Sequence, residues 1–238
     1  MSEVDQVRTQ LGLSVIAGLL VLVITVLGYQ EVVSVTDADR ALLAICLSIS
    51  YILGISMALQ PNWRSRFIRA REARAGSRDD DGPLPGPPRK GHHPDCTGFA
   101  GHTVSWGGRI RCAGCTGLVM GAVAAILLTT AYVLEPPSVL WTYGPGLVIA
   151  GIALVALDLF AANAGGLDPR AGLGLNALMI VGFAMVCVGL LESTGEVTWG
   201  LVGVVLSALW MDTRIQLSRW NHATMCALCP EGCVAYTL

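Results

Sequence analysis

Two groups of cysteine and histidine residues carry the chemistry that this sequence offers. Their spacings are Cys96-x5-His102-x9-Cys112-x2-Cys115 and His222-x3-Cys226-x2-Cys229-x3-Cys233. Each group supplies enough nitrogen and sulfur ligands for a closed tetrahedral zinc site, and a Cys-x2-Cys pair can place both sulfurs on one ion. His92, His93 and Asp95 lie beside the first group and are alternative ligands. We therefore expect metal binding, with zinc as the cofactor.

The spacing leaves several arrangements open. The two groups could form two sites, or Cys112 and Cys115 could join two C-terminal cysteines in one all-thiolate site. The close C-terminal cysteines with Pro230 also resemble loops that hold iron–sulfur clusters, although the spacing differs from the usual ferredoxin run. A Cys-x2-Cys pair can instead act as a redox dithiol. An iron–sulfur cluster or a dithiol is thus the alternative to zinc.

The segments that must position these residues have the composition of a membrane protein. The chain has 238 residues, of which 53% are hydrophobic and only 13% are charged, whereas soluble domains are about 25% charged. A net charge of -2 provides no basic field for nucleic acid, so we expect none as a partner. The first apolar run is too long for a secretory signal and is preceded by acids, which predicts a retained helix.

Six stretches are expected to cross a lipid bilayer, because each is an apolar run close to the length of about 20 residues that a spanning helix needs. They are residues 11–29, 41–59, 112–134, 144–164, 171–191 and 197–211. The last is the shortest, because Glu196 and Asp212 bracket it. The predicted fold class is all-α: a polytopic membrane helical bundle of about six transmembrane helices, with small cytoplasmic Cys/His-rich metal-binding elements.

The basic residues predict the orientation of the chain. Of 15 Lys and Arg, only Arg40 falls on the side of the loops near 31–40, 135–143 and 192–196. Since basic loops stay in the cytoplasm, we expect both termini and both cysteine groups on the cytoplasmic side of a cell membrane. Stable disulfides are disfavoured in that compartment.

Composition divides the chain into five segments. Residues 1–61 hold the first two expected helices, 62–91 form a basic and then Pro/Gly-rich cytoplasmic linker, 92–115 are the Cys/His metal-binding loop, 116–213 hold the remaining helices, and 214–238 are a cytoplasmic Cys-rich tail. The basic part of the linker, Trp63 to Arg78, is expected to set the orientation of the chain. The alternative is that it continues the second helix along the inner leaflet, where anionic head groups attract it.

Polar residues within the expected helices are the remaining candidates. Asp158 is an acid inside a predicted span, which is costly in lipid and makes it a possible intramembrane functional residue. Asn176 is expected to bond a neighbouring helix. Asp212 and Arg214 are expected to anchor the membrane interface, and Gly117 with Gly121 forms a GxxxG pair that favours close helix packing.

The run Arg111-Cys112-Ala113-Gly114-Cys115-Thr116-Gly117, which leads into an apolar helix, resembles an uncharacterised family of predicted prokaryotic integral membrane proteins. Those proteins carry a Cys-His-Gln element and then a Cys-Ala-Arg-Cys-Thr-Gly element that opens a transmembrane helix. By this resemblance Cys96 matches the family's first cysteine, and Cys112 and Cys115 match its pair. This chain lacks the His-Gln after Cys96, reads Cys-Ala-Gly-Cys, and adds the C-terminal group. The resemblance implies a cytoplasmic metal-type site and no established activity.

Three functions fit these observations. The sequence contains no catalytic triad order, phosphate loop, dinucleotide fingerprint or HExxH motif, which argues against an enzyme. We expect structural zinc to organise a cytoplasmic scaffold or docking surface for a protein partner. The alternatives are a membrane redox protein with an iron–sulfur cluster or dithiol, and a small-solute or metal transporter that uses Asp158.

Overall fold

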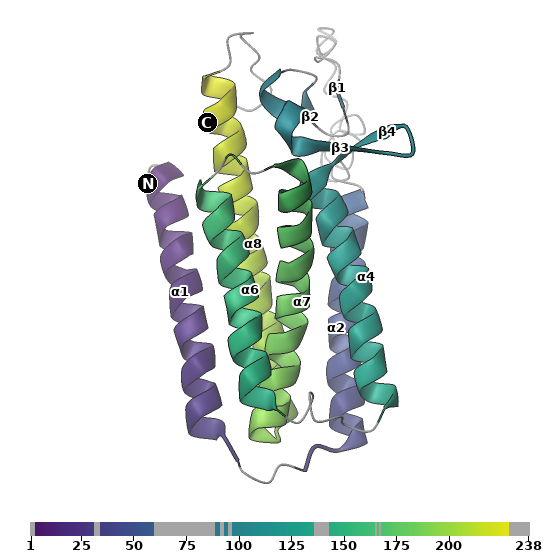
Figure 1. Ribbon diagram of the computed structural model, residues 1–238. Coiled ribbons are helices and arrows are strands. Elements are labelled where there is room, and N and C mark those ends of the chain that lie inside the picture. The colour runs from purple at the N-terminus through teal and green to yellow at the C-terminus, as the bar shows by residue number, and fades with distance from the viewer. Residues whose placement is uncertain are drawn as a thin grey trace, which may run out of the picture.

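In the part of the chain that the structure describes, six long α-helices run side by side in one bundle, up and down in sequence order (Figure 1). The computed structural model describes residues 3–30, 34–59, 89–90, 93–94, 97–135, 143–164, 166 and 168–228. Its helices are α1 (Glu3–Gly28), α2 (Asp37–Leu59), α4 (Ala113–Leu134), α6 (Gly144–Ala164), α7 (Pro169–Thr194) and α8 (Val197–Ala227). The predicted all-α helical bundle is confirmed.

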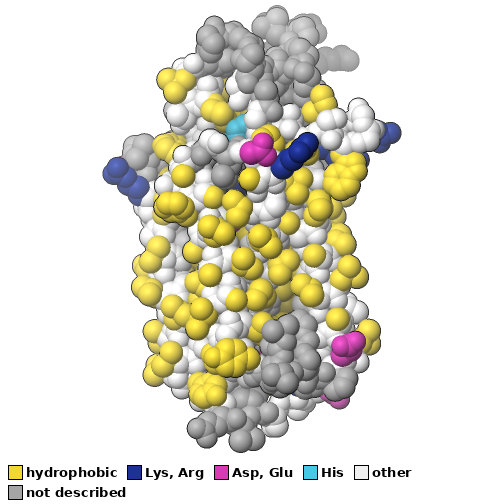
Figure 2. All heavy atoms as spheres, viewed as in Figure 1, with side chains coloured by type: hydrophobic (Ala, Val, Ile, Leu, Met, Phe, Trp, Pro, Cys, Tyr) yellow, Lys and Arg dark blue, Asp and Glu magenta, His cyan; other side chains and the backbone are white. Residues whose placement is uncertain are grey.

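Five of these helices are long and apolar enough to cross a membrane, namely α1 from Asp5 onward, α2, α4, α6 and α7. Large apolar side chains such as Leu27, Leu127 and Phe160 point outward from them, and Figure 2 shows such side chains along most of the bundle's length. A continuous exposed apolar surface of this kind is compatible with a lipid environment and a multi-pass membrane protein. The sixth helix, α8, is not among the five, because polar residues from Asp212 onward interrupt its apolar run.

Several helix ends follow the hydropathy, but α1 begins at Glu3 and α2 at Asp37, eight and four residues before their predicted starts at 11 and 41. α6 has the predicted bounds, and α4 starts one residue later than predicted because Cys112 caps it. α7 begins at Pro169 behind the capping side chain of Asp168 and ends before Gly195, whose φ of 74° stops the helix. The predicted end of the last helix at 211 is wrong, because α8 continues to Ala227.

The extension of α8 is helical because other helices satisfy its polar side chains. Ser14 of α1 shares a hydrogen bond with Thr213 at 2.7 Å. Asn221 donates to the carbonyl oxygen of Ala162 at the end of α6, at 2.8 Å. These partners hold the polar stretch of α8 in the bundle. Residues 214–227 of the predicted tail are therefore helix.

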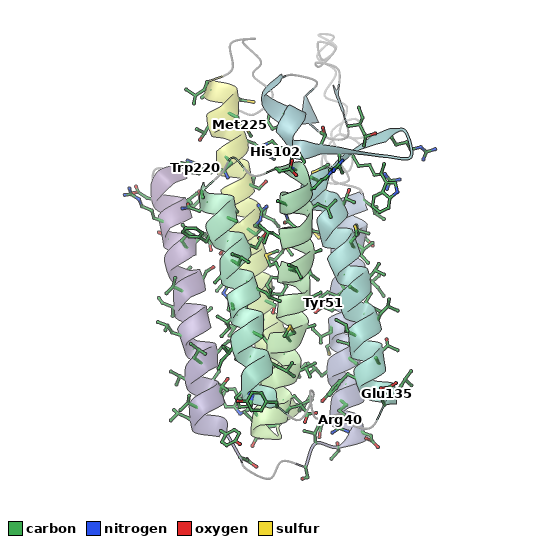
Figure 3. The ribbon with its side chains drawn as sticks, in the orientation of Figure 1. Arg40, Tyr51, His102, Glu135, Trp220 and Met225 are labelled. Carbon is green, nitrogen blue, oxygen red and sulfur yellow. The ribbon has the colours of Figure 1, made fainter. Side chains whose placement is uncertain are left out.

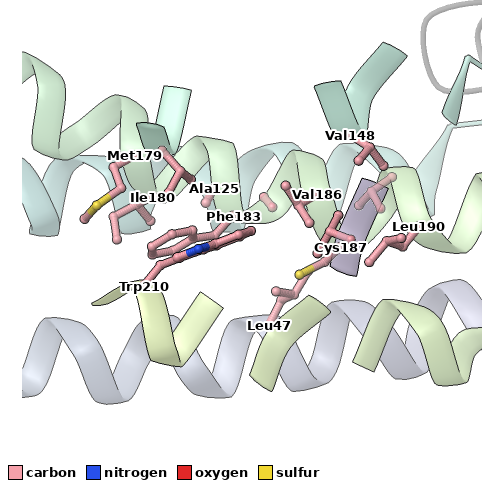
Figure 4. Close-up of a cluster of buried hydrophobic side chains, with 14 of the residues drawn as sticks. Leu47, Ala125, Val148, Met179, Ile180, Phe183, Val186, Cys187, Leu190 and Trp210 are labelled. Atoms are coloured by element: carbon pink, nitrogen blue, oxygen red, sulfur yellow. The ribbon is translucent and has the colours of Figure 1, made fainter. Parts of the chain in front are cut away.

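α7 lies at the centre of the bundle and packs closely against α4, α6 and α8. The indole of Trp210 stacks on the ring of Phe183 with centroids 6.1 Å apart, within a buried apolar cluster (Figure 4). At Gly121 of α4 an added Cβ would lie 2.5 Å from the carbonyl oxygen of Ala177 in α7, so the predicted close packing of the GxxxG pair is present. Asn176, expected to bond another helix, instead donates to Gly172 in its own helix at 2.7 Å.

The expected metal-binding loop contains strands that were not predicted. A short 3-10 helix, η1 (Thr97–His102), leads into a hairpin of β3 (Thr103–Trp106) and β4 (Arg109–Cys112). Gly107 and Gly108 have φ of 56° and 73°, which a two-residue hairpin turn requires. The two-residue strands β1 (Arg89–Lys90) and β2 (His93–Pro94) also pair. These elements lie at the end of the bundle that carries the start of α1 and the end of α8 (Figure 1).

Candidate metal centre

Cys112 and Cys115 are held together at the start of α4. β4 leads directly into this helix, and Cys112 is its N-cap, with its Sγ accepting a hydrogen bond from the backbone nitrogen of Cys115 at 3.5 Å. The hydroxyl of Thr116 donates to the carbonyl oxygen of Cys112 at 2.8 Å and secures the same turn. A helix N-terminus favours thiolate over thiol, because its free N–H groups and peptide dipoles point toward the sulfur.

The hairpin brings His102 to the same place. Thr103 pairs with Cys112 in the β3–β4 ladder, so His102, which directly precedes Thr103, lies beside the start of α4. The nine residues that separate His102 from Cys112 in sequence are taken up by the two strands and their turn. His102, Cys112 and Cys115 are therefore positioned by a β-hairpin and a helix start rather than by an irregular loop.

His222 of α8 meets His102 of the first group. The two imidazole centroids are 5.4 Å apart with planes at 89°. Phe99, a buried residue of η1, contacts both rings, with centroid distances of 5.7 Å to His102 and 5.2 Å to His222. Cys226 follows one turn after His222 on the buried side of α8. Each group thus contributes one imidazole to the same contact, and the described parts of both groups lie at one end of the bundle.

Several predicted ligands lie outside the described residues. These are His92, Asp95, Cys96, Cys229 and Cys233, together with the side chain of His93. Within the described part of the chain, no group of three or more His, Cys, Asp and Glu side chains is arranged to hold a metal ion. What the described structure does bring together is a pair of adjacent cysteines and a pair of adjacent histidines, which are the donor types that zinc takes.

Asp158 has a partner that the sequence analysis did not assign to it. Its side chain is 2% exposed, and its Oδ2 lies 2.9 Å from Nε of Arg214 in α8. Asp212, the other expected interfacial anchor, accepts a hydrogen bond from Gln10 of α1 at 3.2 Å. Both residues therefore bind neighbouring helices within the bundle, and the ion pair gives the buried acid a structural role.

A second polar cluster, at the opposite end of the bundle, was missed. Glu192, expected in an external loop, belongs to α7 and is 8% exposed. Its Oε1 accepts hydrogen bonds from the hydroxyl of Tyr132 and from Nε of Arg40, the latter at 3.4 Å. The guanidinium carbon of Arg40 lies 5.7 Å from the centre of the Tyr132 ring. Figure 3 labels Arg40 at this end and His102 at the other. One feature of the sequence pointed to this cluster. Of the 15 Lys and Arg residues, only Arg40 is assigned to the side of the loops near 31–40, 135–143 and 192–196, where acidic residues are its available partners.

Comparison with known proteins adds no relative. No protein-family model matches this chain, and no significant match was found among curated proteins or solved structures.

Proposed function

We propose that this chain is a multi-pass membrane protein whose cytoplasmic face is held together by structural zinc and serves as a scaffold or docking surface. The contact between His102 and His222 carries the proposal, because it joins a ligand candidate of residues 92–115 to one on α8. The resemblance of residues 96–121 to membrane proteins with a similar cysteine pattern is in accord with it.

In this proposal α8 is the sixth span, and both termini are cytoplasmic. Its 31 residues give a length of about 46 Å at 1.5 Å per residue, against a hydrocarbon core of about 30 Å. The last turns, with His222 and Cys226, therefore extend beyond the lipid core into the aqueous layer. We assign that layer to the cytoplasm, because the sequence puts 14 of the 15 Lys and Arg residues in segments on that side of the predicted spans.

The zinc ligands are Cys112 and Cys115, completed by His102 or His222 and by one cysteine outside the described residues. Of these cysteines, Cys96 is the nearest in sequence to the hairpin. The N-cap position suits Cys112 to be a thiolate ligand, and Cys115 follows it within the same turn. A site filled by four protein ligands has no open position for substrate, so its role is structural. Zinc at this point would add its binding free energy to folding, and with His222 as a ligand it would also tie the hairpin to α8.

A redox role is the second candidate, because one observation favours it as well. The hydrogen bond from the Cys115 amide to Sγ of Cys112 places a Cys-x2-Cys pair at a helix N-terminus, the environment in which a thiolate becomes reactive. In that case the pair would exchange electrons as a dithiol or would hold an iron–sulfur cluster.

Transport through Asp158 is the third candidate and has less support. The carboxylate is engaged with Arg214, so its burial has an explanation that does not involve a solute.

Elemental analysis of protein purified without oxygen separates the first two candidates. We expect zinc at one or two atoms per chain, no iron, and loss of zinc in Cys112→Ser and Cys115→Ser. The matched control is Cys46→Ser, which removes a thiol from the middle of α2 and should leave the zinc content unchanged. Iron with a brown colour would replace the zinc proposal by a cluster. Metal-free protein with a reversible Cys112–Cys115 disulfide would replace it by a dithiol.

A further inference from the structure

The β3–β4 hairpin has one face that combines an aromatic residue with two arginines. Residues directly opposite each other in an antiparallel pair lie on the same face of the ladder. Trp106 pairs with Arg109 and Val104 pairs with Arg111, so these side chains share a face, which we name the Trp/Arg face. Trp106 is 61% exposed, and both arginines are exposed. Residues 97–134 contain no Asp or Glu that would neutralise this face locally.

The hairpin lies at the level where the expected membrane ends. α4 has 22 residues, or about 33 Å of helix, which matches a hydrocarbon core of about 30 Å. Cys112, which caps α4 and ends β4, therefore lies at the boundary between the hydrocarbon and the head groups. From there the hairpin extends sideways past α4, beyond the outline of the bundle, rather than along the bundle axis (Figure 1). Figure 2 shows Lys or Arg side chains projecting at this level, above the apolar belt.

We propose that the Trp/Arg face rests on the inner leaflet of the membrane that the chain spans and binds anionic lipid head groups there. Tryptophan prefers the membrane interface, because its indole is apolar with one polar N–H. Arginine pairs with phosphate oxygens through two parallel N–H donors, and its carbon stem packs on apolar surface. The sideways course of the hairpin selects lipid over a cytoplasmic protein as the occupant. The inference rests on the proposed membrane insertion and is independent of any metal.

The test follows Trp106 in the full chain. Protein labelled with 5-fluorotryptophan is reconstituted into nanodiscs of phosphatidylcholine, alone or with phosphatidylglycerol, and the Trp106 fluorine resonance is assigned with Trp106→Phe. A gadolinium chelate attached to lipid head groups should broaden this resonance. A soluble gadolinium chelate should broaden it less than the lipid-attached chelate does, because the membrane protects Trp106 from the solvent. Phosphatidylglycerol should increase this protection from the soluble chelate, because an anionic leaflet attracts the arginines.

Two double variants separate a specific contact from a general charge effect. In Arg109→Gln/Arg111→Gln, we expect the phosphatidylglycerol-dependent gain in protection to fall at least about twofold. The control Arg170→Gln/Arg219→Gln removes the same charge from exposed positions on α7 and α8 at the same end of the bundle and should keep the gain.

Two results would overturn the inference. One is a Trp106 resonance that the soluble chelate broadens equally with and without phosphatidylglycerol. The other is a gain in protection that survives Arg109→Gln/Arg111→Gln. Co-elution of the chain with nanodiscs tests the membrane proposal separately, and a sharp resonance from the buried Trp210 shows that the bundle is folded.

Discussion

Removing Arg214 should destabilise the bundle strongly, because it leaves a buried carboxylate without its cation. Asp158 is 2% exposed, whereas the Arg214 side chain is 18% exposed, and their Oδ2 and Nε atoms are 2.9 Å apart. Asp158 lies six residues before the end of α6 at Ala164, or about 9 Å along the helix axis, so its carboxylate has little access to water. Truncating one partner of a buried ion pair costs about 3–5 kcal/mol, and we expect Arg214→Leu to cost that much.

Neutralising Asp158 should destabilise the bundle less than removing Arg214. Asp158→Asn keeps an oxygen that can accept from Nε of Arg214, and the arginine, being partly exposed, retains access to polar surroundings. We expect a cost of about 1–2 kcal/mol, in the range for one weakened hydrogen bond. The double variant Asp158→Leu/Arg214→Leu removes both charges and should be more stable than Arg214→Leu alone, because an apolar pair replaces an unpaired charge.

Unfolding of the purified protein in detergent micelles, followed by circular dichroism, measures these differences. The control is Arg170→Leu, which removes an exposed arginine at the same end of the bundle and should stay within about 0.5 kcal/mol of the unmodified chain. If Arg214→Leu costs less than about 1 kcal/mol, or if Asp158→Leu/Arg214→Leu is no more stable than Arg214→Leu alone, the pairing with Arg214 is not what stabilises the buried carboxylate. Loss of solute uptake in a stable Asp158→Asn protein would instead favour the transport hypothesis.

Three further predictions concern packing, the second polar cluster and the metal. Gly121→Ala should cost about 1–3 kcal/mol in thermal unfolding, because its Cβ would lie 2.5 Å from the carbonyl oxygen of Ala177. The control Gly18→Ala, whose Cβ would have nothing within 4 Å, should be neutral or stabilising. Equal effects of the two substitutions would contradict the packing argument. Tyr132→Phe removes a donor to the buried Glu192 carboxylate and should cost about 1–3 kcal/mol in the same assay; an unchanged melting temperature would show that the cluster is not stabilising. Chelation of zinc should raise the rate of amide hydrogen exchange both in the β3–β4 hairpin and in the last turns of α8, while α6 and α7 remain protected. A response confined to one of these two segments would indicate that the metal does not join them.

Hydropathy alone determined most of the helical architecture. A chain in lipid must satisfy its backbone internally, so each long apolar run becomes a helix. The bounds follow the hydropathy only in part, because α1 and α2 begin in charged residues before their apolar runs. Even so, 144–164 was predicted with the bounds that α6 has, and 112–134 was predicted to within one residue of α4. The adjacency of Cys112 and Cys115 was likewise a local property, because two residues of spacing keep them within one turn.

The tertiary structure decided everything that depends on partners distant in sequence. α8 continues past 211 because Ser14, Asp158 and Ala162 satisfy its polar side chains, and none of these is near it in the chain. The meeting of His102 with His222 requires both the hairpin register and that extension. Residue types and spacing specify which side chains can bind a metal, but only packing between helices brings imidazoles from the two groups to the same end of the bundle.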